Sequence, residues 1–164
     1  MTKLAFQDCY PEELSHCYGC GKNNIDGHQL KSYWQHIDEQ NLINSITIAH
    51  ATPPLKYTAI PGFVYGGMIA SLIDCHGTGS ASAMAYLVAK REMGTSPALR
   101  FVTGALNVSY LAPTPQGVEL QLIGRFSEIK ARKIIVEISL LANDVICAKG
   151  QVIAILMPDS MCPK

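Results

Sequence analysis

One carboxylate stands alone in the most apolar stretch of the sequence. Between Gly62 and Ala89 the only formally charged residue is Asp74. Desolvating a carboxylate without partners costs several kcal/mol, so we expect Asp74 to be paired, hydrogen-bonded or protonated. Such an acid is a candidate general base or nucleophile. The alternative is a structural aspartate bonded to nearby backbone or to a basic residue.

A pair of glycines comes just ahead of this acid. Tyr65-Gly66-Gly67 lies at the expected start of a helix, where the first N–H groups lack intrahelical partners and form the positive end of the dipole. Glycines also let a ligand approach the backbone closely. The pair could therefore form an oxyanion hole for a tetrahedral intermediate. Taken alone, a glycine pair more often serves only a tight turn.

The elements that must position these residues follow from apolar periodicity. Residues 64–88 contain no proline and carry apolar side chains on most sides, which predicts a helix buried nearly all round. We expect a turn-rich segment at 1–28 and a hairpin tip at Asn143-Asp144. Together these elements predict an α+β fold, with one antiparallel sheet wrapped around a long central helix, in a single domain over 1–164. Alternating apolar patterns predict the strands, at 30–36, 42–49, 103–111, 118–126, 134–142 and 145–157.

Composition narrows the functional classes. Lys plus Arg and Asp plus Glu are balanced at 13 each, which gives no electrostatic case for nucleic acid or an acidic membrane. No apolar stretch is long and clean enough to span a bilayer, and the first fourteen residues do not have the pattern of a signal peptide. The six scattered cysteines favour reduced thiols in the cytoplasm.

Three motifs resemble the hotdog-fold thioesterases, in their phenylacetate-degradation and THEM-like branch. The stretch from Pro61 to Asp74 is similar to the His-Gly-Gly…Asp signature of that family. Cys17-Tyr18-Gly19-Cys20-Gly21, followed by Asn24 and Gly27, is similar to the family's opening, and 107–113 resembles its strand-plus-proline segment. The resemblance covers residues 16 to 157. It implies a hotdog fold, hydrolysis of an acyl-CoA thioester, no cofactor, and a homodimer or a dimer of dimers.

The resemblance also implies roles for single residues. Gly66 would present its N–H to the thioester carbonyl, and Gly67 would support that turn. Asp74 would act as general base or nucleophile. Thr103 falls where related enzymes carry a Ser or Thr that helps to place the water, and Met68 is expected to contact the substrate.

The sequence departs from the family at one position. The family's histidine is Tyr65 here, and tyrosine cannot carry protons near neutral pH, although it can still orient a substrate. His76 is a candidate substitute at the substrate. Because residues two apart point to different sides of a helix, His76 cannot simply pair with Asp74 of its own chain, and a packed or hydrogen-bonded His76 is favoured.

The spacing of Gly66 and Asp74 predicts an assembly. Eight positions along a helix span about 12 Å, whereas one thioester carbonyl must lie within about 3 Å of both groups. If both act on one substrate, they come from different subunits. Catalysis then requires at least a dimer.

Two other groups of residues are candidate sites. Cys17-x-x-Cys20, with His16 and His28 nearby, could form a zinc corner, but a structural zinc takes four ligands and no second Cys-x-x-Cys exists, so we predict no metal. The basic hairpin at 128–133 could bind coenzyme A phosphates. Its candidate residues are Lys130 and Arg132, helped by Lys90, Arg91 or Arg100.

Other functions on the same fold remain open. A non-catalytic acyl-CoA binder is favoured by Tyr65 in place of histidine. A dehydratase would need a His with Asp or Glu at a spacing that this sequence lacks, and a purely structural subunit would make Asp74 dispensable. The acyl group, the choice between CoA and carrier-protein thioesters, and dimer against tetramer are not fixed by the sequence.

Overall fold

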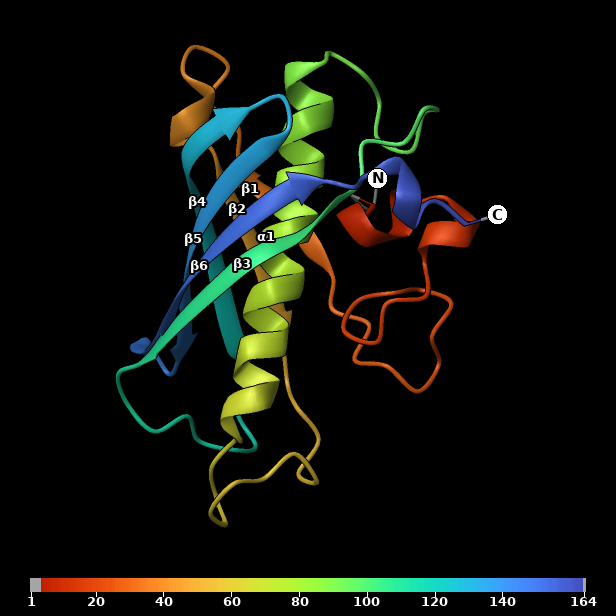
Figure 1. Ribbon diagram of the computed structural model, residues 1–164. Helices are drawn as coiled ribbons and strands as arrows, with labels where there is room; N and C mark the ends of the chain where they lie inside the picture. Colours follow the sequence, from red (N-terminus) through yellow and green to blue (C-terminus); the bar gives the residue numbers. More distant parts are fainter. Residues whose placement is uncertain (1–3, 164) are drawn as a thin grey trace.

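Six antiparallel strands form one sheet that curves around helix α1 in the computed structural model, which describes residues 4–163 (Figure 1). The order across the sheet is β1-β2-β4-β5-β6-β3. The predicted α+β architecture, with one antiparallel sheet around a long helix, is confirmed. The main elements are β1 (Ser32–His36), β2 (Ile46–Ala51), α1 (Gly66–Val88), β3 (Phe101–Tyr110), β4 (Leu120–Lys130), β5 (Lys133–Ala142) and β6 (Val145–Leu156). Short 3-10 turns occur at η1 (Phe6–Cys9), η2 (Glu12–Leu14), η3 (Leu42–Asn44) and η4 (Asp159–Met161).

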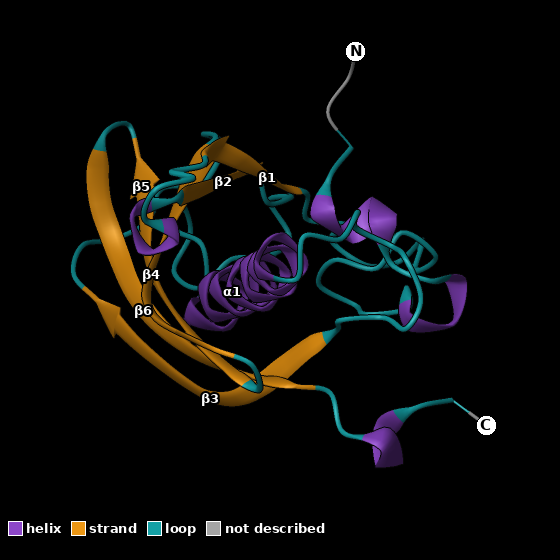
Figure 2. Cartoon of the chain, turned by 90° about the horizontal axis from the view of Figure 1, so that it is seen from above, coloured by secondary structure: helices purple, strands orange, loops and turns teal. Residues whose placement is uncertain are grey.

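Helix α1 is covered on most sides, as its apolar pattern predicts. The sheet curves around one side of the helix, and the N-terminal segment with η1 and η2 lies on another (Figure 2). A Cβ at Gly77 would lie 2.5 Å from the Val152 side chain on β6. The glycine thus lets helix and sheet approach closely, and this contact offsets its poor helix propensity.

A buried chain of polar side chains links four parts of the fold. The His76 ring on α1 lies between the Ser32 hydroxyl on β1, 2.9 Å from Nδ1, and the Thr47 hydroxyl on β2, 3.2 Å from Nε2. Gln7 extends the chain by donating to Ser32 at 3.0 Å, and Ser80 extends it from Thr47 at 2.7 Å. All five side chains have no solvent exposure. Because they satisfy one another, the network fixes the N-terminal segment on the helix and sheet without leaving unpaired polar atoms.

One predicted strand begins four residues later than expected. The chain at Leu42–Asn44 forms the 3-10 turn η3, and β2 starts only at Ile46. The cause lies in the preceding polar residues. The Asp38 carboxylate accepts the N–H groups of Gln40 and Asn41, each at 3.0 Å. Such local bonds compete with the extended ladder and turn the chain.

The predicted hairpins are present. Asn143 and Asp144 join β5 to β6 with φ of 49° and 63°, the left-handed conformation that a two-residue hairpin loop requires. The β4–β5 hairpin turns at Ala131-Arg132, between Lys130 and Lys133. None of the helices within residues 4–163 is both long enough and apolar enough to cross a membrane.

Strand β3 forms one edge of the sheet, paired only with β6 among the described strands. It is ten residues long, and most of its residues beyond Val102 are exposed. A long, uncovered edge presents a row of unpaired backbone groups that favours pairing with another strand. This edge also carries Thr103.

Candidate active site

Asp74 and Thr103 form a direct hydrogen bond between helix and sheet edge. The Thr103 hydroxyl on β3 donates to Oδ1 of Asp74 on α1 at 2.5 Å. Asp74 is half-buried and Thr103 is exposed. Burial raises the pKa of Asp74, while the Thr103 hydrogen bond opposes part of that rise. The predicted lone acid is therefore partnered by a hydroxyl and keeps access to solvent, as a general base requires.

A bulge in β3 points Thr103 toward the helix. The pairing with β6 shifts register between Thr103 and Ala105, where Gly104 is the additional residue. Phe101 lies in the core before the bulge, and Leu106 packs against the core after it. Strict alternation would put Thr103 and Leu106 on opposite faces, so the extra residue is what lets both face the helix.

The glycine pair begins α1. Tyr65 is the N-cap residue, and its carbonyl accepts the N–H groups of Met68 at 3.1 Å and Ile69 at 3.4 Å. The N–H groups of Gly66 and Gly67 precede these first intrahelical bonds and lie at the positive end of the helix. A Cβ at Gly67 would lie 2.4 Å from the Tyr65 ring, which folds back over it. Gly66 is half-buried, and its carbonyl accepts the Tyr110 hydroxyl at 2.8 Å.

An apolar groove of about 340 Å³ adjoins Gly66. Ile69 lines it from the helix, and Phe63, Tyr110 and Leu111 line it from the flanking segments. Phe63 is 40% exposed, Tyr110 54% and Leu111 57%. Large apolar side chains gathered in this way mark a surface that binds a ligand or another chain.

Gly66 and Asp74 belong to one uninterrupted helix, because α1 runs from Gly66 to Val88. The eight positions between them therefore correspond to about 12 Å of helical rise. Within one chain, a single carbonyl carbon cannot contact both the Gly66 amide and the Asp74 carboxylate.

Two residues that the sequence suggested as substrate contacts, Met68 and His76, have buried side chains. Met68 is 2% exposed and lines a second cavity, of about 700 Å³, together with Leu72, Tyr57 and His28. Neither Gly66 nor Asp74 lines that cavity. His76 has no exposed surface and lies in the polar network between β1 and β2, which corresponds to the packed, hydrogen-bonded alternative. Burial lowers the pKa of His76 to about 3 and keeps the ring neutral.

The basic candidates lie together at one end of the sheet. The Arg132 carbonyl accepts the Leu156 N–H at 3.0 Å. The Arg100 carbonyl accepts the N–H of the next residue, Met157, at 2.8 Å. The Arg100 guanidinium lies 4.3 Å from the Tyr10 ring centroid and donates to the Phe101 carbonyl at 2.6 Å.

A third basic candidate, Lys130, is exposed at the β4–β5 hairpin and pairs with Glu128 at 3.0 Å. Lys133 pairs with the same carboxylate at 2.6 Å. Such exposed pairs are worth little energy and exchange readily for another anion.

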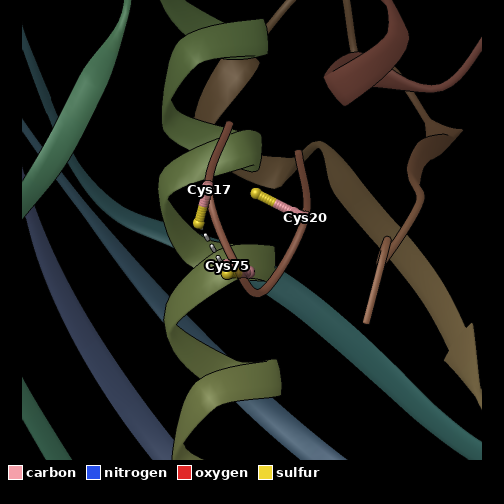
Figure 3. Close-up of side chains that lie close together, drawn as sticks. All are labelled: Cys17, Cys20 and Cys75. Atoms are coloured by element: carbon pink, nitrogen blue, oxygen red, sulfur yellow. Dashed lines mark hydrogen bonds between the residues drawn. The ribbon is translucent and has the colours of Figure 1, made fainter. Parts of the chain in front are cut away.

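The structure also brings together three cysteines that the sequence did not connect. Cys75 on α1 lies beside Cys17 and Cys20 of the N-terminal segment (Figure 3). The sequence carried one signal, the Cys-x-x-Cys spacing, but Cys75 is distant along the chain and only the fold places it there.

Comparison with known proteins identifies the family. The family model described as the thioesterase superfamily matches residues 61–148, the segment that contains both Gly66 and Asp74. The chain belongs to this superfamily. No curated protein sequence matches the chain.

Among solved structures, a thioesterase superfamily protein from Shewanella loihica is 51% identical over 88% of this chain and 96% of its own, with a TM-score of 0.64. The E. coli PaaI protein from the phenylacetic acid degradation operon is 13% identical over 77% of this chain and 80% of its own, with a TM-score of 0.59. A thioesterase from Haemophilus influenzae is 12% identical over 84% of this chain and 85% of its own, with a TM-score of 0.62. The last two share the fold alone. The hotdog fold and the thioesterase relationship that the motifs predicted are therefore confirmed.

Proposed function

We propose that this superfamily member hydrolyses an acyl-CoA thioester at a site shared by two subunits. The Gly66 N–H of one chain polarises the thioester carbonyl. Asp74 of the other chain activates a water, or attacks first to give a short-lived anhydride. In either route the thiolate of CoA leaves and the carboxylic acid is released.

The observation that carries this proposal is the position of both groups on one continuous helix. Since about 12 Å of helix separates Gly66 from Asp74, a second copy must supply one of them if both act on one carbonyl. Two exposed features support that second copy. The outer edge of β3 pairs with no other strand of the described residues, and apolar side chains gather around Gly66. A two-fold axis would bury the same surfaces on both chains and generate two equal sites.

The substrate's two ends have different candidate sites. The apolar groove beside Gly66 suits an acyl chain, because its walls are Phe63, Ile69, Tyr110 and Leu111. The exposed basic residues at the far end of the sheet, Lys130 and Arg132, suit the phosphates of CoA, whereas the Arg100 guanidinium already contacts the Tyr10 ring and the Phe101 carbonyl.

Tyr65 supports a second candidate function, a non-catalytic acyl-CoA binder. The family's histidine is absent at this position, and the Tyr65 ring lies over Gly67 and near Tyr57, with ring centroids 6.3 Å apart. We place the catalytic proton transfer on Asp74 alone, with Tyr65 as a wall that orients the substrate. The binder would have the same groove and no turnover.

Turnover of a panel of acyl-CoAs distinguishes the two. Short, medium, long and aromatic acyl-CoAs are assayed by loss of thioester absorbance with wild type, Asp74→Asn and the matched control Asp144→Asn, which alters an exposed hairpin acid. We expect hydrolysis of at least one substrate, a fall in kcat of about 100-fold or more in Asp74→Asn, and no change in the control. Tight CoA-ester binding without hydrolysis by the wild type would instead establish the binder.

A further inference from the structure

The three sulfur atoms of Cys17, Cys20 and Cys75 lie within 4.8 Å of one another. Cys17 and Cys20 come from the loop that crosses α1, and Cys75 projects from the helix beneath them (Figure 3). All three are free thiols. Cys17 is exposed, whereas Cys20 and Cys75 are buried. One side of the cluster is therefore open to solvent.

One sulfur pair has the spacing of a tetrahedral metal site, and the third sulfur lies within 4.8 Å of both. Zinc–thiolate bonds of about 2.3 Å at tetrahedral angles place neighbouring sulfurs about 3.8 Å apart. The Cys17 and Cys75 sulfurs are 3.9 Å apart.

The backbone around Cys17 and Cys20 is held in a tight loop that brings both sulfurs to the helix. The Gly21 N–H donates to the Cys17 carbonyl at 2.7 Å, and the Leu30 N–H donates to the Gly19 carbonyl at 3.0 Å. A Cβ at Gly19 would lie 2.2 Å from the Cys75 sulfur, and one at Gly21 would lie 2.4 Å from the Ser15 carbonyl oxygen. Gly19 thus lets the loop lie close to α1, and Gly21 lets the loop fold tightly on itself.

We propose that Cys17, Cys20 and Cys75 bind one zinc ion as thiolates, with a water molecule in the fourth position. Binding displaces three thiol protons to the solvent and joins the N-terminal segment to α1. Cys75 follows Asp74 directly in the helix, so the ion also restrains the turn that carries the proposed catalytic acid. The expectation of no metal rested on too few protein ligands, and the fold adds Cys75 as a third. This inference does not depend on the proposed thioesterase activity.

The first test is the zinc content of protein purified under reducing conditions, measured by elemental mass spectrometry. The variants are Cys75→Ser, Cys17→Ser and the matched control Cys162→Ser, which removes an exposed cysteine of the C-terminal segment. We expect about one zinc per chain in wild type and control, and less than about a tenth of that in the two ligand variants. Because Cys17 is exposed, Cys17→Ser keeps the test valid if Cys75→Ser fails to fold.

The second test uses cobalt as a spectroscopic probe. Co²⁺ added to metal-free, reduced protein should give the sulfur-to-cobalt charge-transfer bands and the intense visible bands of a tetrahedral thiolate site, and these should be absent from Cys17→Ser. A zinc chelator should lower the Tm of wild type and leave the Tm of Cys17→Ser unchanged. The proposal is overturned if reduced wild type neither retains zinc nor binds Co²⁺, or if the zinc content is the same in all variants.

Discussion

The Thr103 hydroxyl on the edge strand donates to the Asp74 carboxylate on the central helix at 2.5 Å. This bond joins the proposed general base to the strand edge that we expect to meet a second subunit. It stabilises the ionised carboxylate against the effect of burial, which raises its pKa.

Removing this hydroxyl should slow the chemistry. In Thr103→Val the shape of the side chain is kept but the charge-assisted hydrogen bond is lost, so kcat should fall about tenfold with little change in KM. Thr103→Ser retains the donor and should keep most of the activity. Steady-state kinetics with the best acyl-CoA of the panel measures both effects. Equal kcat values in the Val and Ser variants would show that the Thr103 hydroxyl does not take part in the reaction.

The Gly66 amide can be deleted with a matched control. Proline is well tolerated at the first position of a helix and lacks the N–H, and Tyr65 already has the extended conformation that a residue before proline prefers, with φ −73° and ψ 150°. Gly66→Pro should therefore lower kcat about 100-fold without unfolding the protein. Gly66→Ala adds the same Cβ, 3.2 Å from the movable Tyr110 ring, but keeps the amide, and it should remain active. If alanine is as damaging as proline, the space at Gly66 matters and its N–H does not.

Tyr65 should act through its ring and not through its hydroxyl. The ring packs over Gly67 and near Tyr57, so Tyr65→Phe should preserve both kcat and KM. Tyr65→Ala removes the wall and should raise KM several-fold while changing kcat less. A large fall of kcat in Tyr65→Phe would show that the hydroxyl takes part in the chemistry.

Much of the fold can be predicted from the sequence, because the apolar residues recur at the spacing of a helix or of a strand. The continuous apolar stretch predicts α1 to within two residues at its start, and Asn143-Asp144 predicts the β5–β6 hairpin. The Gly66 and Asp74 motif also predicts which helix carries the candidate site. The segment that begins at Leu42 is the exception. Its apolar residues alternate as in a strand, but the hydrogen bonds to the Asp38 carboxylate just before it turn the chain.

The contacts between distant segments could not be predicted in this way. The bulge at Gly104 changes which side of β3 faces the helix, and no alternation rule shows it. The placement of Cys75 beside Cys17 depends on how the N-terminal loop crosses α1. His76 similarly has its partners, Ser32 and Thr47, on strands far away in the sequence.

The buried His76 should make stability depend on pH. Its pKa is about 3 in the folded chain because of burial, against an ordinary 6.5. Below pH 6.5 the unfolded chain binds a proton that the folded chain does not, so the free energy of unfolding should fall by about 1.4 kcal/mol per pH unit down to about pH 3.

Urea unfolding at one protein concentration measures this effect. From pH 7 to pH 5 wild type should lose about 2 kcal/mol more than His76→Asn, which has no proton to bind. An equal loss of unfolding free energy in both proteins would mean that the His76 ring is already protonated in the folded chain, or that it does not contribute to the pH dependence of stability.

A site shared between subunits is the central claim, and a mixed dimer tests it directly. Gly66→Pro and Asp74→Asn chains carrying different affinity tags are co-expressed, and the heterodimer is isolated with both tags. If the two groups come from opposite chains, one of its two sites is intact and the heterodimer should show about half of the wild-type activity, although each variant alone is inactive. A heterodimer of wild type with the Gly66→Pro/Asp74→Asn double variant should then be inactive. The reverse pattern, an inactive first heterodimer and a half-active second one, would contradict the account by placing Gly66 and Asp74 of the same chain in one site.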